Sequence, residues 1–97
     1  MAVPDFQSWF LPLLERTRDG QVHTMFELYE QLADDLKLTL EDRSEVLPSG
    51  GQLKYRNRIG WARTYLKKAG LLEAPGEGRV RITERGLHVL GVNPIPS

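Results

Sequence analysis

Six basic side chains and no acidic one lie between Leu53 and Lys68. The six are Lys54, Arg56, Arg58, Arg63, Lys67 and Lys68. Guanidinium and ammonium groups at this density are suited to bind a polyanion, above all the phosphates of a nucleic acid. Phosphate binding is therefore the first chemistry that the sequence indicates.

The charges of the whole chain are also unevenly distributed between its two halves. The net charge of the 97 residues is zero, but residues 1–50 carry a balance of −6 and residues 51–97 a balance of +6. This asymmetry favours a polyanionic partner for the second half. Mutual neutralisation of the two halves within the fold would give the same composition, so charge alone leaves both interpretations open.

Other chemistries have little support in the sequence. The chain has no cysteine, and its two histidines, His23 and His88, stand apart without the spacing of metal ligands. No phosphate-binding GxxxxGK[ST] loop and no GxSxG nucleophile motif occurs. We therefore expect no cofactor, no metal and no catalytic residue in this chain.

The sequence contains one loose match to a metal-dependent nuclease pattern, PD...(D/E)xK. It consists of Pro4-Asp5 and Asp35-Leu36-Lys37. Both pieces fall in helical patterns, whereas a metal site of this type needs neighbouring strands. We therefore expect Asp5 to cap a helix and Asp35 to be a solvated helix residue.

Hydropathy places the chain among soluble proteins. No apolar run approaches the roughly 20 residues of a membrane span. The N-terminus also lacks the basic start and apolar core of a secretion signal. We expect a cytoplasmic protein without a membrane partner.

Apolar periodicity predicts the helices that must position the cations. A first helix has one apolar face and Asp5 as its cap, and its apolar residues are Phe6, Trp9, Phe10, Leu13 and Leu14. After a brief extended piece at Val22 and His23, Thr24 caps a second helix with the apolar residues Phe26, Leu28, Leu32, Ala33 and Leu36. Thr39 and Asp42 predict a capping arrangement for a short helix from Leu40 to Leu47.

The third long helix is predicted from Gln52 to Ala69, with Gly70 as a left-handed C-cap. Its apolar stripe consists of Tyr55, Ile59, Ala62, Leu66 and Ala69. At about 100° per residue, the side away from the stripe carries Arg56, Arg63 and Lys67, with Asn57, Thr64 and Lys68 beside them. Trp61 lies about 60° from the edge of the stripe. It could stack on a base or sugar, but we expect it to pack between helices in the core. Arg58 points toward the core side, where we expect a carboxylate partner.

A hairpin is predicted after this helix. Its strands are Leu71–Ala74 and Arg79–Thr83, joined by the turn PGEG, and Thr83 caps a final helical turn. Val80 and Ile82 would point inward and Arg79 and Arg81 outward. The order helix, short strand, helix, helix, hairpin predicts an α+β, mainly helical fold: a winged helix-turn-helix with a short two-stranded wing.

Three segments carry a resemblance to a known family. The PSG loop at 48–50, NRIGWARTYLKKAGLLE at 57–73 and RITERG at 81–86 resemble the N-terminal domain of Mrr-type restriction endonucleases in order and spacing. The resemblance implies a winged-helix DNA-binding domain, here 1–91, followed by a Pro-containing linker, 92–97. It also implies a separate C-terminal nuclease domain that uses Mg²⁺ and cuts DNA carrying methylated bases. Which modified base is read stays open.

The predicted partner is double-stranded DNA, and the predicted contacts form two groups. The helix and wing contribute Lys54, Arg56, Asn57, Arg63, Thr64, Lys67, Lys68, Arg79 and Arg81. A phosphate-binding loop before the helix would use backbone N–H groups of Ser49, Gly50, Gly51 and Gln52. Asn57 has two interpretations, pairing with adenine or making a local structural hydrogen bond.

Two alternatives have the same fold. The chain could be a protein-interaction module that forms a homo-oligomer, with its basic face against the acidic second helix of a neighbouring copy. It could also be a transcriptional regulator with specificity for a short palindromic operator.

Overall fold

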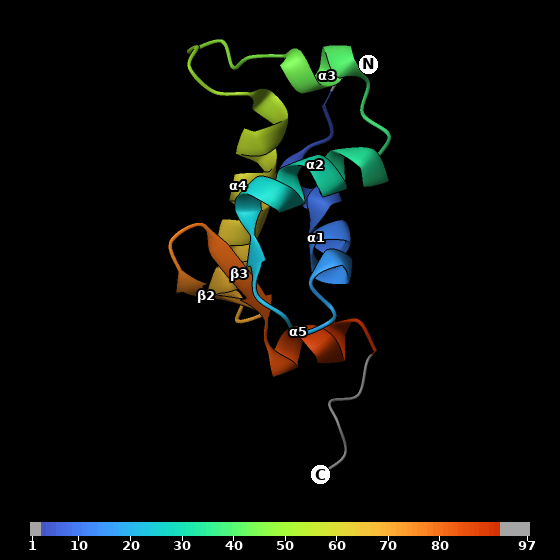
Figure 1. Ribbon diagram of the computed structural model, residues 1–97, viewed down its shortest axis with the longest axis vertical. Coiled ribbons are helices and arrows are strands. Elements are labelled where there is room, and N and C mark those ends of the chain that lie inside the picture. The colour runs from blue at the N-terminus through green and yellow to red at the C-terminus, as the bar shows by residue number, and fades with distance from the viewer. Residues whose placement is uncertain (1–2, 92–97) are drawn as a thin grey trace.

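Helices make up most of the chain, and one small sheet lies against them (Figure 1). The computed structural model describes residues 3–91, so the predicted linker at 92–97 lies outside the described residues. In chain order the elements are the 3-10 helix η1 (Phe6–Trp9), α1 (Phe10–Arg16), β1 (His23–Thr24), α2 (Met25–Asp35), α3 (Leu40–Ser44), α4 (Lys54–Lys68), β2 (Leu72–Gly76), β3 (Arg79–Ile82) and α5 (Glu84–Val89). The predicted α+β class is confirmed.

All the predicted helix caps are confirmed. The side chains of Asp5, Thr24, Thr39 and Thr83 each accept a hydrogen bond from a backbone N–H in the first turn that follows. Thr39 forms a reciprocal capping box with Asp42. Each cap satisfies a donor that the helix start would otherwise leave unpaired.

Two predicted boundaries are wrong because the segment between α3 and α4 pairs with itself. Val46 forms an antiparallel bridge with Leu53, and the Leu47 N–H donates to the Gln52 carbonyl. This pairing ends α3 at Ser44 instead of Leu47. It also delays the start of α4 to Lys54.

The core lies where α1, α2 and α4 meet the sheet. Its fully buried large side chains are Trp9, Leu13, Leu28, Leu32, Tyr55, Ile59 and Val80. The predicted apolar faces of the helices are therefore largely confirmed, but Phe26 of the second helix and Ala69 at the end of the third long helix are exposed. Phe26 is 73% exposed, because its neighbour Met25 takes the buried position at the start of α2.

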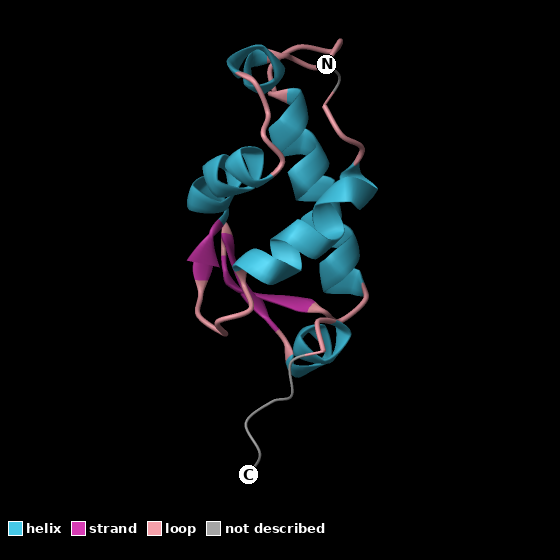
Figure 2. Cartoon of the chain, turned by 90° about the vertical axis from the view of Figure 1, so that its right-hand side faces the viewer, coloured by secondary structure: helices cyan, strands magenta, loops and turns pink. Residues whose placement is uncertain are grey.

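The sheet is antiparallel with strand order β1-β3-β2. Val80 and Ile82 of β3 are buried, as predicted. A register shift between Glu73 and Gly76 lengthens β2 beyond its predicted end. Figure 2 shows the sheet covering one end of the helical layer, with α5 below it.

The tip of the β2-β3 hairpin lies against the start of α2. The Met25 N–H donates to the Gly78 carbonyl at 2.8 Å, so the hairpin does not project freely from the body. This contact brings the hairpin turn beside the helices (Figure 1). No helix within residues 3–91 is both long and apolar enough to cross a membrane.

Candidate nucleic-acid interface

Helix α4 has one buried side and one side that carries the predicted interface. Tyr55, Ile59, Ala62 and Leu66 are buried, as the apolar stripe predicted. Gly70 follows the helix with φ of 79°, which confirms it in the left-handed position after the C-cap. The core contacts of the stripe fix the rotation of α4 and so determine which polar side chains face outward.

Arg63 and Lys67 line a groove between α4 and the hairpin, with a volume of about 520 Å³. We call it the α4–hairpin groove. Its lining residues are Met25, Tyr29, Arg63, Lys67, Ala74, Gly76, Glu77 and Gly78. A second, smaller hollow on α4 is lined by Arg63, Thr64, Lys67 and Lys68. Two helices and the hairpin thus surround one open, mainly cationic surface.

Arg63, Lys67 and Lys68 make no hydrogen bond or ion pair with other residues in the described part of the chain. Arg79 is also unpaired within 3–91, and it stands opposite Gly76 in the hairpin register. Lys67, Lys68 and Arg79 are exposed, and Arg63 is half-buried. These four predicted residues keep their charge available to a partner.

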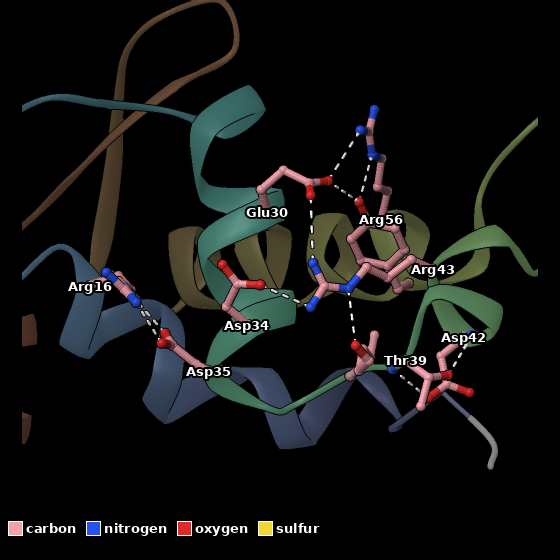
Figure 3. Close-up of polar contacts among 10 residues, drawn as sticks. Arg16, Glu30, Asp34, Asp35, Thr39, Asp42, Arg43 and Arg56 are labelled. Atoms are coloured by element: carbon pink, nitrogen blue, oxygen red, sulfur yellow. Dashed lines mark hydrogen bonds and ion pairs between the residues drawn. The ribbon is translucent and has the colours of Figure 1, made fainter.

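Arg56 is held by neighbouring side chains instead (Figure 3). Its Nη2 lies 3.7 Å from Glu30 Oε2, and its Nε donates to the Tyr55 hydroxyl at 3.2 Å. Its guanidinium carbon lies 5.1 Å from the centre of the Tyr29 ring. The hydrogen bond with Tyr55 is the largest cause of the raised pKa of Arg56. The charge of Arg56 is therefore partly balanced within the domain.

Glu30 connects three helices (Figure 3). It accepts the Tyr55 hydroxyl at 2.7 Å and lies 3.6 Å from Arg43 of α3. Arg43 also contacts Asp34 at 2.8 Å and donates to the Leu38 carbonyl. This network attaches α3 and the N-terminal half of α4 to α2.

The two pieces of the loose nuclease match lie in ordinary helical surroundings. Asp5 caps η1, as predicted. Asp35 is not simply solvated, because its carboxylate accepts two hydrogen bonds from Arg16 of α1, with Nη2 to Oδ1 at 2.5 Å. This hydrogen bonding is the largest cause of the raised pKa of Arg16. Asp35 therefore forms an ion pair that links α1 to α2.

The first turns of α4 are internally hydrogen-bonded. Asn57 donates to the Gln52 side chain at 3.2 Å and accepts from Arg58 Nη1 at 2.5 Å. Both ends of its amide are used, which agrees with the local structural interpretation of Asn57. The predicted carboxylate partner of Arg58 is wrong, because its guanidinium donates to the Asn57 side chain and forms no ion pair within residues 3–91. Lys54 lies 3.4 Å from Glu45.

The predicted phosphate-binding loop is an exposed turn at the N-terminal end of α4. Gly50 and Gly51 both have φ of 79°, which glycine adopts without strain. The Gly50 N–H donates to the Leu47 carbonyl at 2.7 Å and is used within the turn. Ser49 and Gln52 are exposed beside them. This loop and the hairpin flank different ends of α4 (Figure 1).

On the hairpin, the two predicted arginines differ. Arg79 is exposed, whereas Arg81 forms an ion pair with Glu73 across β2 and β3, in which Nε donates at 3.0 Å. Arg81 therefore stabilises the strand pair, and Arg79 is the hairpin arginine with a free charge.

Trp61 lies at the surface of α4, contrary to the prediction. It was expected in the core but is 51% exposed. The space between η1 and α4 is filled by other rings, since Phe6 stacks on Tyr65 with centroids 4.9 Å apart. The signal was present in the angular offset of Trp61 from the apolar stripe.

Comparison with known proteins gives the family. Residues 6–91 match the Mrr N-terminal domain. The Type IV methyl-directed restriction enzyme EcoKMrr of Escherichia coli (strain K12) is 33% identical over 97 residues. That alignment covers 99% of this chain and 32% of the relative, so the chain spans about a third of the relative's length. No solved structure matches the chain. The predicted resemblance is thus confirmed, and the chain belongs to the Mrr N-terminal domain family.

Proposed function

We propose that this chain binds double-stranded DNA, as the targeting domain of an Mrr-type restriction endonuclease. The observation that carries the proposal is the pairing pattern of the cations. Three of the four cations in residues 1–50, Arg16, Arg18 and Arg43, contact carboxylates. In contrast, Arg63, Lys67, Lys68 and Arg79 keep their charges unpaired within the described residues, around α4 and the hairpin.

The architecture supports a winged-helix mode of binding. Helix, strand, two helices, the long helix α4 and then a hairpin follow one another, and β1 joins the hairpin in one sheet. In winged-helix DNA binding, α4 would enter the major groove. Its diameter of about 10–12 Å fits a groove about 12 Å wide. The hairpin would contact the sugar-phosphate backbone beside it.

The free cations are assigned to phosphates, which fix the position of the domain without specifying sequence. Arg56 has a smaller role in this proposal, because Glu30 competes with DNA for its guanidinium group. Catalysis and Mg²⁺ are assigned to a separate nuclease domain. In this proposal, only the complete enzyme with its nuclease domain would cleave methylated DNA.

The test compares two double variants, each of which lowers the net charge of the protein by two. Arg63→Gln/Lys67→Gln removes the cations of the α4–hairpin groove, and Arg18→Gln/Lys37→Gln removes two cations elsewhere. Fluorescence anisotropy with a labelled 25-base-pair duplex is recorded over a salt series. We expect the groove variant to bind at least tenfold more weakly at 50 mM salt and to lower the slope of log affinity against log salt by about 1.8, or two phosphate contacts.

The control variant should bind within about twofold of the parent protein. Equal losses in both variants would show that net charge alone matters and would contradict the proposed surface. Absence of DNA binding, together with salt-sensitive self-association, would favour the interaction module instead.

A further inference from the structure

Helix α2 contributes a tyrosine, Tyr29, to the lining of the α4–hairpin groove. The side chain of Tyr29 is half-buried, and its hydroxyl has no hydrogen-bond partner within residues 3–91. In this part of the chain every buried polar side-chain atom has a partner, so the unpaired hydroxyl must reach solvent. Tyr29 therefore brings a free hydrogen-bond donor to the groove.

The ring of Tyr29 is held by Arg56. The guanidinium carbon of Arg56 lies 5.1 Å from the centre of this ring, which is within the range of a cation–π contact. Arg56 is itself fixed by the Tyr55 hydroxyl and by Glu30 (Figure 3). Because the ring is already ordered, little conformational entropy is lost when its hydroxyl binds a ligand.

The same groove contains two free cations of α4. At about 100° per residue, Arg56, Arg63 and Lys67 lie in one row along this helix, and Arg63 is nearer to Arg56 than Lys67 is. Arg63 and Lys67 line the groove together with Tyr29. One free hydroxyl from α2 and two free cations from α4 are thus available to a single ligand.

These three groups fit a ligand with several acceptor oxygens. Guanidinium and ammonium groups can only donate, whereas a base edge presents donors and acceptors together. A backbone phosphate of DNA offers acceptors only, and tyrosine hydroxyls bind such phosphates as arginine and lysine do. Glu77 of the hairpin turn also lines the groove and would repel a phosphate. This repulsion favours a phosphate position close to α2 and α4.

We propose that the Tyr29 hydroxyl donates to a backbone phosphate of DNA in the α4–hairpin groove, and that this phosphate is shared with Arg63. Arg56 is then a positioning residue, which acts through the ring of Tyr29 and not through a phosphate contact of its own. This inference rests on the proposed DNA binding and adds to it an uncharged contact residue from α2.

The test separates an uncharged contact from a charged one. Tyr29→Phe removes the hydroxyl and keeps the ring over which Arg56 lies. The control, Tyr65→Phe, removes the hydroxyl of an exposed tyrosine that lines a different hollow of α4, beside Trp61. Anisotropy with a labelled 25-base-pair duplex is recorded over a salt series for both variants and for Arg63→Gln. Thermal unfolding checks that each variant is folded.

We expect Tyr29→Phe to bind about three- to tenfold more weakly than the parent protein at 50 mM salt, as the loss of one hydrogen bond would give. The slope of its log affinity against log salt should stay at the parental value, because an uncharged hydroxyl displaces no counterion. Arg63→Gln should instead lower this slope by about 0.9. Tyr65→Phe should bind within about twofold of the parent protein.

Arg56→Lys tests the positioning role, because lysine keeps the charge but lacks the planar group that lies over the ring. This change should weaken binding about two- to threefold in the parent protein and have no further effect in Tyr29→Phe. An equal loss in both backgrounds would show that Arg56 acts independently of the Tyr29 hydroxyl and would overturn its positioning role.

Parental affinity of Tyr29→Phe would overturn the inference and leave the proposed function intact. A loss of the same size in Tyr65→Phe, or a lower salt slope for Tyr29→Phe, would do the same. Failure of the parent protein to bind the duplex would instead overturn the proposed DNA binding itself, so the two failures are distinguishable.

Discussion

At the residue scale, Tyr55 connects the core to the polar network that holds α4. Its ring is buried, and its hydroxyl donates to Glu30 and accepts from Arg56. Burial is the largest cause that raises the pKa of Tyr55 above 10.0, and the hydrogen bond to Glu30 acts in the same direction. The folded protein therefore favours the protonated phenol.

This linkage predicts a pH dependence for Tyr55→Phe. The unfolded chain releases the phenolic proton at a lower pH than the folded chain. The stabilisation from protonated Tyr55 is thus complete below pH about 10 and is lost as the pH rises through the folded-state pKa. Urea unfolding should show a deficit of about 0.5–1.5 kcal/mol for Tyr55→Phe at pH 7. The deficit should shrink at pH 10.5, and a deficit that is equal at both pH values would contradict this linkage.

At the scale of elements, α4 contains a glycine, Gly60, that no packing within residues 3–91 requires. Gly60→Ala should raise the free energy of unfolding by about 0.5–1 kcal/mol, because alanine has the higher helix propensity and the site has space for a methyl group. The same change should weaken DNA binding if α4 enters the major groove as proposed, since the added methyl group would then stand where α4 approaches the bases. Thermal unfolding and anisotropy on one sample measure both effects.

Gly86→Ala in α5 provides the opposite case. A Cβ atom at Gly86 would overlap the Leu71 carbonyl oxygen and the Ile82 side chain, so this variant should be destabilised by about 1–3 kcal/mol. A lower melting temperature for Gly60→Ala, or unchanged DNA affinity, would argue against a glycine kept for the interface.

Elements were predictable from the sequence where their signals are local. Thr24, Thr39 and Thr83 act on backbone groups within their own helices, so residue type and spacing were enough. Phe26 and Trp61 were predicted wrongly because burial depends on which distant residues fill a space. The sequence shows apolar character but not that Met25, or the stacked pair Phe6 and Tyr65, fills it first.

The candidate site shows the same limit. The cationic segment is evident in the sequence, but pairing decides which of its charges are free. Arg56 is held by Glu30 of α2 and Arg81 by Glu73 of β2, and neither pair follows from spacing along one element. The sequence predicted all of these cations as DNA contacts alike. The tertiary structure shows that some of them form ion pairs within the domain and others do not.

At the scale of the whole molecule, the zero net charge hides a separation of charge that, in the proposed function, orients the domain toward DNA. The α4–hairpin groove contains one acidic residue, Glu77, near the hairpin tip beside Arg63 and Lys67. Glu15 belongs to α1, and this helix lies on the opposite side of the view from the hairpin (Figure 1). Replacing either glutamate by glutamine changes the net charge equally, so their comparison separates local from global electrostatics.

Glu77→Gln should bind DNA about three- to tenfold more tightly than the parent protein at 50 mM salt, because it removes a repulsive charge close to the phosphates. Glu15→Gln should have a much smaller effect, since its charge lies farther from the DNA and is screened over a Debye length of about 10 Å at 0.1 M salt. Both differences should disappear near 0.5 M salt. Anisotropy over a salt series measures them, and equal gains from the two variants would show that the groove is not the surface that meets the DNA.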